Sequence, residues 1–262
     1  MTQLAVAVSG GVDSLCALLR LREQGHDILA LHGLFLPDAA SSGPRPAHDG
    51  PRLLTAAEAL DAPLPPASRQ AVEGLRTACG QLGIPLHVAD MRAVFDREVV
   101  TPFVRAYARG RTPNPCALCN RAIKFGALLD AALGLGADRI ATGHYARLQE
   151  GPSGPLLAAA DDLAKDQSYF LCQLSQEQLS RALFPVGGLL KPEVRRIAEE
   201  QGLATAKRKD SQGICFVGKV DLPTFLQQKL APKKGNIHEI LPAWPKYVRE
   251  EVPAEGEPTT GQ

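Results

Sequence analysis

Apolar residues along this chain fall into two patterns, short uninterrupted runs and positions at helical spacing. The first run, residues 4–8, is apolar and partly β-branched, as in a buried parallel strand. Leu15, Leu18 and Leu19 follow at helical spacing, and that segment ends at Gly25, a residue that commonly stops a helix. The same patterns predict further strands at 27–36, 84–89 and 138–143 and further helices at 69–82, 96–109, 121–133 and 191–202. This alternation predicts an α/β fold, a parallel sheet with helices on both faces.

Two stretches interrupt the alternation. Residues 37–66 are rich in Pro, Ala, Ser, Gly and Asp, which predicts a mobile surface insertion with one short helix at 53–60. Near the other end, a last helix is expected at 221–230, and residues 242–262 are rich in Pro and Glu, as in a tail. The repeated strand and helix units therefore lie in the first four fifths of the chain.

Proline and capping residues set several expected boundaries. Pro102 is expected to kink or split the helix at 96–109, and two further prolines are expected to keep 110–120 as a loop. Ser175, with Gln178 three residues later, predicts a capping box at the start of a helix.

A glycine-bearing stretch, Ser9-Gly-Gly-Val-Asp-Ser14, joins the first strand to the first helix. Two glycines allow a tight turn, and the free N–H groups of the helix that follows suit an anion. Ser9 and Ser14 add hydroxyl donors, and Asp13 can hold a metal ion that bridges phosphates. The stretch contains neither a Walker motif nor Gly-x-Gly-x-x-Gly, and the alternative is an ordinary glycine turn. It resembles the pyrophosphate loop of the ATP pyrophosphatases, which cleave ATP between the α and β phosphates and adenylate a substrate.

Composition limits the classes of partner. The chain has 262 residues, of which 45% are hydrophobic and 22% charged, as in a globular protein. Its formal net charge of +1 gives no global attraction to nucleic acid, so any RNA site must come from a local patch. No apolar run approaches membrane-spanning length and no signal peptide precedes the first strand, so we expect a cytoplasmic protein with no membrane partner.

The cysteine pair Cys116-Ala-Leu-Cys119 is the clearest candidate for thiol chemistry. By itself such a pair is compatible with zinc, a redox pair, iron–sulfur ligands or chance, although structural zinc needs four ligands and no second pair is present. Cys119 is expected near the N-terminus of the helix at 121–133, with Lys124 nearby. Both features would lower the pKa of its thiol.

Four other cysteines complete the count of six. Cys215 lies in a glycine-bearing loop beside lysines, whereas Cys16, Cys79 and Cys172 fall in apolar helical stretches and are expected to be buried. A disulfide framework is not expected in a reducing cytosol.

Eight stretches taken together resemble the tRNA-specific 2-thiouridylase family, whose members thiolate the wobble uridine of certain tRNAs. They occur in the family's order, cover about residues 1–218, and are Ser9-Gly-Gly-Val-Asp-Ser14, Gly33-Leu-Phe35, Gly110-Arg-Thr-Pro-Asn-Pro115, Cys119-Asn-Arg-Ala-Ile-Lys-Phe125, Ala141-Thr-Gly-His-Tyr145, Lys165-Asp-Gln-Ser-Tyr-Phe170, Leu183-Phe-Pro-Val-Gly187 and Asp210-Ser-Gln-Gly-Ile-Cys-Phe216. The resemblance implies an ATP pyrophosphatase (PP-loop) domain at 1–218. It also implies that 219–262 hold only part of a central domain, without the C-terminal β-barrel.

The resemblance also implies roles for individual residues. Cys119 matches the family's nucleophile and Cys215 the cysteine that carries a persulfide. The residues implied to bind ATP are Ala7, Val8, Ser9, Gly10, Gly11, Val12, Asp13, Ser14, Leu36 and Gly143. The residues implied to contact the target base or the rest of the tRNA are Asn114, Pro115, Cys116, His144, Lys165, Asp166 and Gln167. For His144 the alternative is a hydrogen-bonded histidine that closes a strand.

Cys116 departs from the family pattern, because many members have Asp at this position. Together with Cys119 and Cys215 it makes three thiols that can hold a [4Fe–4S] cluster, with one iron open to bind sulfide. The implied activity is ATP- and Mg²⁺-dependent 2-thiolation of tRNA, with adenylation of the C2 oxygen followed by sulfur transfer from a donor protein or sulfide. Two alternatives remain open, an adenylating enzyme that acts on another substrate and a non-catalytic sulfur or metal carrier.

Overall fold

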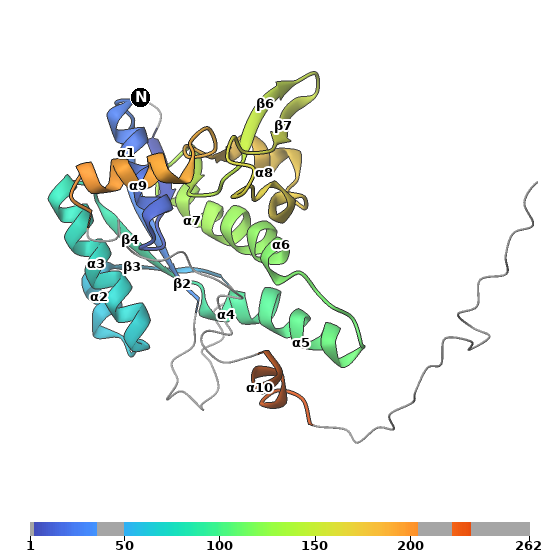
Figure 1. The fold of residues 1–262 in the computed structure, drawn as a ribbon. Coiled ribbons are helices and arrows are strands. Elements are labelled where there is room, and N and C mark those ends of the chain that lie inside the picture. The colour runs from blue at the N-terminus through green and yellow to red at the C-terminus, as the bar shows by residue number, and fades with distance from the viewer. Residues whose placement is uncertain (1–2, 36–49, 204–221, 232–262) are drawn as a thin grey trace, which may run out of the picture.

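The computed structural model describes residues 3–35, 50–203 and 222–231, and a six-stranded sheet lies at its centre (Figure 1). The strands lie in the order β3-β4-β2-β1-β5-β8, and every neighbouring pair is parallel except β3 with β4. Their bounds are Gln3–Ala7 (β1), Asp27–Leu34 (β2), Arg52–Thr55 (β3), Leu86–Asp90 (β4), Arg139–Thr142 (β5) and Ala182–Leu183 (β8). The predicted α/β fold with a parallel sheet is confirmed.

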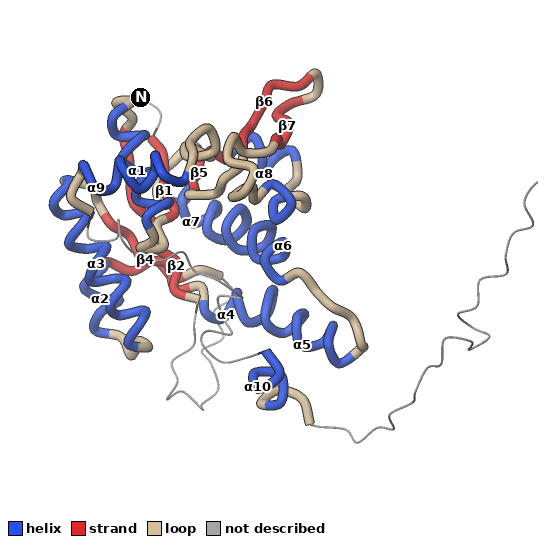
Figure 2. Tube along the Cα trace, in the orientation of Figure 1, coloured by secondary structure: helices blue, strands red, loops and turns tan. Residues whose placement is uncertain are grey.

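The other elements surround this sheet (Figure 2). The α-helices are Val12–Glu23 (α1), Ala56–Asp61 (α2), Pro66–Leu82 (α3), Arg92–Phe95 (α4), Thr101–Ala108 (α5), Pro115–Cys119 (α6), Leu128–Gly134 (α7), Gln176–Arg181 (α8), Lys191–Glu200 (α9) and Leu222–Gln227 (α10). Asp96–Val100 (η1) and Asn120–Ala127 (η2) are π-helical, and Ser168–Leu171 (η3) is a 3₁₀-helix. A two-stranded hairpin, Arg147–Gly151 (β6) with Gly154–Ala158 (β7), extends away from the main sheet.

Each face of the sheet has its own core, because successive side chains of a strand point to opposite faces. Leu4 of β1 shares one core with Leu18 of α1 and Leu75 of α3. Ala5, the next residue of β1, shares the other core with Leu128 of α7 and with Phe125. Helices therefore cover both faces, as predicted.

A third layer covers the outer side of α1. Val194 and Ala198 of α9 pack with Cys16 and Ala17 of α1 (Figure 1). Helix α9 is therefore anchored to the helix that follows the glycine loop, although about 170 residues of sequence separate them. This packing is what brings the start of α9 to the loop.

The strand order places two strand ends side by side. From β1 the chain builds β2 and then β4 on one side, and it returns to add β5 on the other side of β1. The carboxyl ends of β1 and β5 therefore meet at the point where the strand order reverses. In open α/β sheets this is where ligands bind.

Part of the predicted insertion is ordered as an edge of the sheet. The expected helix at 53–60 is confirmed in part: residues 56–60 belong to α2, whereas residues 53–55 belong to strand β3, which pairs antiparallel with β4. Thr55 ends the strand and starts the helix, because its side chain accepts a hydrogen bond from the Glu58 backbone in a capping box. Residues 37–49 of the insertion lie outside the described residues.

Two helix boundaries also differ from the sequence prediction. The segment predicted as a loop at 110–120 ends at Asn114, because Asn114 caps α6 and Pro115 occupies its first position. Pro102 does not split its helix; the chain runs from α4 through η1 into α5 without a break, and the π-helical turn immediately before α5 accommodates the proline. Within the described residues, no helix is long and apolar enough to cross a membrane.

Candidate functional site

The glycine loop between β1 and α1 is held by its own serines. Ser9 N donates to Ser14 Oγ at 3.1 Å, and Ser14 Oγ donates to the Gly11 carbonyl oxygen at 3.0 Å. Gly10 has φ of 76°, in the left-handed region that favours glycine. Gly11 occupies the N-cap position of α1 and offers no capping side chain, so backbone N–H groups of the first turn are left for an anion.

Gly143, at the end of β5, lies directly against the start of α1. A Cβ at this position would stand 2.6 Å from the Ser14 nitrogen and 2.8 Å from the Asp13 carbonyl carbon, distances that real Cβ atoms do not adopt. Only glycine allows this approach. The structure thus brings together the predicted nucleotide residues 7–14 and Gly143, whereas Leu36 lies outside the described residues.

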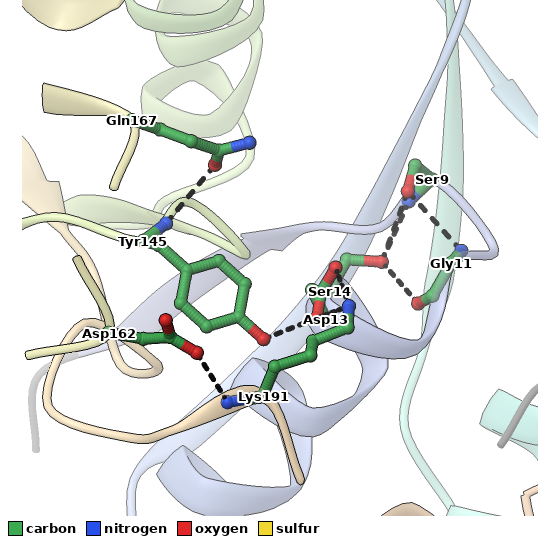
Figure 3. Close-up of polar contacts among 8 residues, drawn as sticks. All are labelled: Ser9, Gly11, Asp13, Ser14, Tyr145, Asp162, Gln167 and Lys191. Carbon is green, nitrogen blue, oxygen red and sulfur yellow. Dashed lines mark hydrogen bonds and ion pairs between the residues drawn. The ribbon is translucent and has the colours of Figure 1, made fainter. Parts of the chain in front are cut away.

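Asp13 is held by two residues that are distant in sequence (Figure 3). Lys191 Nζ lies 2.7 Å from Asp13 Oδ1 and 2.9 Å from Oδ2, and the Tyr145 hydroxyl donates to Oδ1 at 2.8 Å. The Lys191 side chain is only 9% exposed, so the ion pair is largely shielded from water. The Lys191 backbone nitrogen donates to Asp162 Oδ2 at 2.9 Å, which fixes the start of α9.

These contacts do not fit the predicted use of Asp13 as a metal ligand. Both of its oxygens face an ammonium group, which occupies the positions that a metal ion would take on this carboxylate. Sequence reasoning missed Lys191 altogether. The only local signal was a lysine at the first position of a helix, where the helix dipole disfavours a positive charge.

The cysteine pair lies on one short helix. Cys116 and Cys119 are the second and last residues of α6, and a spacing of three places them on the same side of the helix. The Asn114 side chain accepts from the Cys116 nitrogen at 3.1 Å and from the Ala117 nitrogen at 3.2 Å. The helical segment begins at Pro115 and not at 121, so Cys116 lies closer to its N-terminus than Cys119 does.

The two thiols have different surroundings. Cys116 is half-buried, and burial raises the pKa of its thiol although the charge of Lys124 opposes this. Cys119 is buried in a small apolar cluster with Val94, Phe95, Val99 and Ile123. Cys215 lies outside the described residues.

His144 lies directly after Gly143 in sequence and contacts Lys124, which follows the cysteine pair in sequence. Its ring is buried, and burial first, then the charge of Lys124, hold its pKa well below the usual value. Lys124 Nζ lies 3.1 Å from His144 Nε2, and an ammonium group can only donate. Nδ1 of the neutral ring therefore carries the proton and donates to Thr142 Oγ1 at 2.7 Å. Both ring nitrogens are paired inside the protein, which agrees with the alternative of a histidine that closes a strand.

The segment predicted to contact tRNA also has partners within the fold. Asp166 accepts hydrogen bonds from Ala160 N at 2.8 Å and Ser168 Oγ at 2.7 Å. Burial alone would raise the pKa of Asp166, but these hydrogen bonds lower it below its usual value. Gln167 Oε1 accepts from Tyr145 N at 3.2 Å, so this segment fixes the residue whose hydroxyl meets Asp13. Contact of Lys165, Asp166 and Gln167 with RNA stays a prediction.

Of the three cysteines expected to be buried, two are. Burial raises the pKa of both Cys16 and Cys79 to about 11. Cys172 is exposed, which corrects the prediction. It directly follows the 3₁₀-helix η3, which is too short to bury every side of the chain.

A parallel sheet whose first strand leads through a glycine loop into a helix, with a second strand end pressed against that loop, defines an open α/β domain, a class that binds ligands at the carboxyl ends of its strands. The sequence model of one family, described as "tRNA methyl transferase HUP domain", matches residues 2–219. The chain belongs to this family, and the resemblance to the tRNA-specific 2-thiouridylases is confirmed by its relatives.

Those relatives are substantially longer. The chain is 46% identical over 244 residues to the tRNA-specific 2-thiouridylase MnmA of Flavobacterium johnsoniae, covering 92% of this chain and 57% of the relative. It is 45% identical over 243 residues to that of Thermus thermophilus, covering 92% and 61%. The chain thus spans about three fifths of the length of these curated relatives. Among solved structures, a U34-tRNA thiolase NcsA from Methanococcus maripaludis with its [4Fe-4S] cluster is similar at 16% identity and a TM-score of 0.44, over 87% of this chain and 67% of that one.

Proposed function

We propose that this chain carries the adenylation and sulfur-transfer site of an ATP-dependent tRNA uridine 2-sulfurtransferase. Family membership supports the reaction class, and one structural observation carries the assignment of the site. The loop of residues 9–14 meets Gly143, and the next residue is His144. His144 contacts Lys124 of η2, the π-helical segment that directly continues the helix holding Cys116 and Cys119. An ATP site and a thiol pair are therefore contiguous.

The first step we propose is adenylation of the wobble uridine. The C2 oxygen attacks the α phosphate of ATP, the bond to the β phosphate breaks, and pyrophosphate leaves as N3 gives up its proton. The loop of residues 9–14 binds the phosphates with backbone N–H groups, and Gly143 keeps the helix start accessible. We propose ATP with Mg²⁺ as the cofactor set, and Mg²⁺ neutralises phosphate charge when it is bound.

Sulfur transfer follows in this proposal. The terminal sulfur of a persulfide on Cys215 attacks C2, and AMP departs with the C2 oxygen. Cys119 then attacks the Cys215 sulfur, which frees the 2-thiouridine and leaves a disulfide between the two cysteines. A dithiol reductant restores both thiols, and a sulfur-donor protein then transfers the outer sulfur of its own persulfide to the Cys215 thiolate, which releases the donor's thiol. The target uridine must leave the anticodon stack to reach the site, as single-stranded RNA allows.

A cluster route is the second way to use these thiols. Cys116 and Cys119 share one side of α6, so with Cys215 they can hold a [4Fe–4S] cluster, which would supply a site for bound sulfide. The proposal keeps both routes because iron and sulfide analysis of protein prepared without oxygen separates them. Stoichiometric iron supports the cluster route, and active protein without iron supports the persulfide route.

The remaining assignments extend the same proposal. We assign residues 1–218 to the catalytic domain and 219–262 to part of a central domain, and we place the activity in the cytoplasm. Asn114, Pro115 and Cys116 are proposed to contact the target base, with His144 and residues 165–167 contacting the tRNA more widely. Because His144 and Gln167 are paired within the fold, their contacts to RNA require those pairs to open.

Exchange of labelled pyrophosphate into ATP tests this function. We expect exchange that depends on added tRNA with an unmodified wobble uridine. We also expect 2-thiouridine formation when a persulfide donor and a dithiol reductant are supplied, or when sulfide is supplied if the cluster route operates. Exchange that is independent of tRNA would favour an adenylating enzyme with another substrate. ATP binding without exchange in the presence of tRNA would favour a non-catalytic carrier, and either result would overturn the proposal.

A further inference from the structure

We infer that Lys191 is the cation through which this chain contacts the phosphates of ATP, and that Asp13 is a positioning residue for Lys191 and not a metal ligand. The inference rests on the proposed function only in its choice of ATP as the ligand. It assigns a phosphate-binding role to the first residue of α9, about 180 residues from the glycine loop.

The first argument is the geometry of the ion pair. Lys191 Nζ stands 2.7 and 2.9 Å from the two carboxylate oxygens of Asp13, so one ammonium group faces both oxygens (Figure 3). The Tyr145 hydroxyl also donates to Oδ1 of Asp13, at 2.8 Å. A metal ion bound to Asp13 would have to displace a cation that is already seated there.

The second argument is charge at the start of α1. Asp13 lies in the first turn of this helix, where the N–H groups suited to phosphate are located. An uncompensated carboxylate at this position would repel the phosphates of ATP. Lys191 neutralises it and adds an ammonium group at the same place, and ammonium groups are common phosphate partners in proteins.

The third argument is that the fold holds Lys191 in an energetically unfavourable position. A largely buried ammonium group requires a partner, and the first turn of a helix disfavours positive charge. The backbone of Lys191 is nevertheless fixed by Asp162, and α9 is packed onto α1 through Val194 and Ala198. These contacts hold the ammonium group at the loop before any ligand is present.

The test is a double-mutant cycle on ATP binding, which requires neither tRNA nor turnover. The variants are Lys191→Met, which removes the charge at similar length, Asp13→Asn, which removes the charge of the partner, and the double variant. Arg196→Met is the matched control, because Arg196 is an exposed cation on the same helix that pairs with Glu200. Affinity for ATP is measured by calorimetry with EDTA and again with Mg²⁺.

We expect Lys191→Met to weaken ATP binding about tenfold or more under both conditions, and Lys191→Arg to restore part of the loss. Asp13→Asn should weaken binding less. In the Lys191→Met background, Asp13→Asn should cause no further loss and should recover part of the affinity, because it removes a carboxylate that Lys191 no longer neutralises. Arg196→Met should bind ATP like the unaltered chain.

Binding of Mn²⁺ in the presence of ATP, measured by electron paramagnetic resonance, tests the alternative that Asp13 is a metal ligand. Asp13→Asn should leave Mn²⁺ binding to the ATP complex unchanged. The inference is overturned if Asp13→Asn removes bound Mn²⁺ while Lys191→Met leaves ATP affinity unchanged, or if the effects of the two substitutions simply add. It is also overturned if the unaltered chain does not bind ATP.

Failure of the proposed function gives a different pattern. If ATP binding depends on Lys191 as expected but the chain does not thiolate tRNA, the proposed function is wrong and the inference about Lys191 still holds. Should Lys191→Met fail to fold, as judged by circular dichroism, Lys191→Arg and Tyr145→Phe still test it. Both Lys191→Arg and Tyr145→Phe should bind ATP more tightly than Asp13→Asn does. If either variant binds ATP more weakly than Asp13→Asn, that result counts against the inference.

Discussion

The glycine loop of residues 9–14, called here the nucleotide loop, and helix α6 with Cys116 and Cys119, called here the cysteine helix, lie near one edge of the sheet. Different kinds of residue stabilise the two regions. At the loop, glycines let backbone approach backbone, as Gly143 does against Ser14. At the cysteine helix, amide side chains supply the contacts. Asn114 caps its start, Asn120 donates to the Phe170 carbonyl oxygen at 3.0 Å, and Gln178 donates to two carbonyl oxygens of the π-helical segment that follows.

This contrast predicts which substitutions each region tolerates. Adding atoms should damage the nucleotide loop at its contact with Gly143, where a Cβ would meet backbone atoms. Removing polar atoms should damage the cysteine helix, where backbone groups would lose partners. It also predicts that the two chemical steps can be separated by substitution, because each step uses a different region.

The largest expected effect separates the two regions by their chemistry. Cys119→Ser should lower 2-thiouridine formation by about a thousandfold or more while tRNA-dependent pyrophosphate exchange continues, because the substitution removes only the nucleophile. Thiolated tRNA is measured by its retardation in mercury-containing gels. Cys172→Ser, at an exposed thiol, is the control and should retain both steps. Loss of exchange in Cys119→Ser would mean that the regions are not independent.

Gly143→Ala should break the nucleotide loop. Its Cβ meets backbone atoms of Asp13 and Ser14, so we expect a loss of about 1–3 kcal/mol in the free energy of unfolding and a marked loss of ATP affinity. Gly80→Ala is the matched control, because Gly80 lies in helix α3 and its Cβ would meet nothing within 4 Å. That control should stabilise the chain by about 0.5–1 kcal/mol. Equal unfolding curves for the two variants in urea would contradict the close approach.

Gln178→Ala should damage the cysteine helix by removal of atoms. Gln178 Nε2 donates to the carbonyl oxygens of Arg121 and Phe125, each at 2.8 Å, and its side chain also completes the capping box of α8. We expect a loss of about 1–2 kcal/mol in the free energy of unfolding, and a larger effect on thiolation than on ATP binding. Gln176→Ala, an exposed change in the same helix, is the comparison and should stay within about 0.5 kcal/mol.

The last prediction concerns pH and the histidines beside both regions. Burial lowers the pKa of His32, which donates to the Val8 carbonyl oxygen at 2.7 Å, and that of His144. Above about pH 7.5 both histidines are neutral in the folded and unfolded chain and contribute no pH dependence. Below that pH the unfolded chain takes up protons that the folded chain does not. The free energy of unfolding should therefore fall by up to about 1.4 kcal/mol per pH unit for each histidine.

Urea unfolding at pH 7.5, 6.5 and 5.5 measures this slope. His144→Gln keeps an acceptor for Lys124 but cannot be protonated, so it should remove about half of the slope. His26→Gln, at an exposed position, should leave the slope unchanged. A slope that is the same in His144→Gln as in the unaltered chain would show that His144 is accessible to protons in the folded state.

Local sequence signals predicted the parts of the fold that are set locally. The apolar runs located β1, β2, β4 and β5 within a few residues, Gly83 ends α3 in a left-handed conformation, and Ser175 with Gln178 forms the expected capping box. These features depend on residues near one another in sequence. The parallel sheet followed from the alternation of elements.

The errors have physical causes that can be named. Pro115 was interpreted as part of a loop, but a proline that follows a capping asparagine starts a helix, so the helix begins at 115 and not at 121. Strand β3 was missed because an edge strand of four residues carries little apolar pattern. Lys191 was missed because nothing in its neighbourhood specifies a partner in α1.

Asp13 and Lys191 stand 178 residues apart, and this separation has a consequence for synthesis of the chain. At about 5–20 residues per second, a ribosome exposes the glycine loop about 10–40 s before the lysine that completes it. Until then Asp13 has no ammonium partner, and the outer layer made by α9 does not exist. A nascent or prematurely terminated chain that ends before Lys191 therefore lacks the cation that we propose to contact ATP. We expect nucleotide binding only after almost the whole domain has been synthesised and folded.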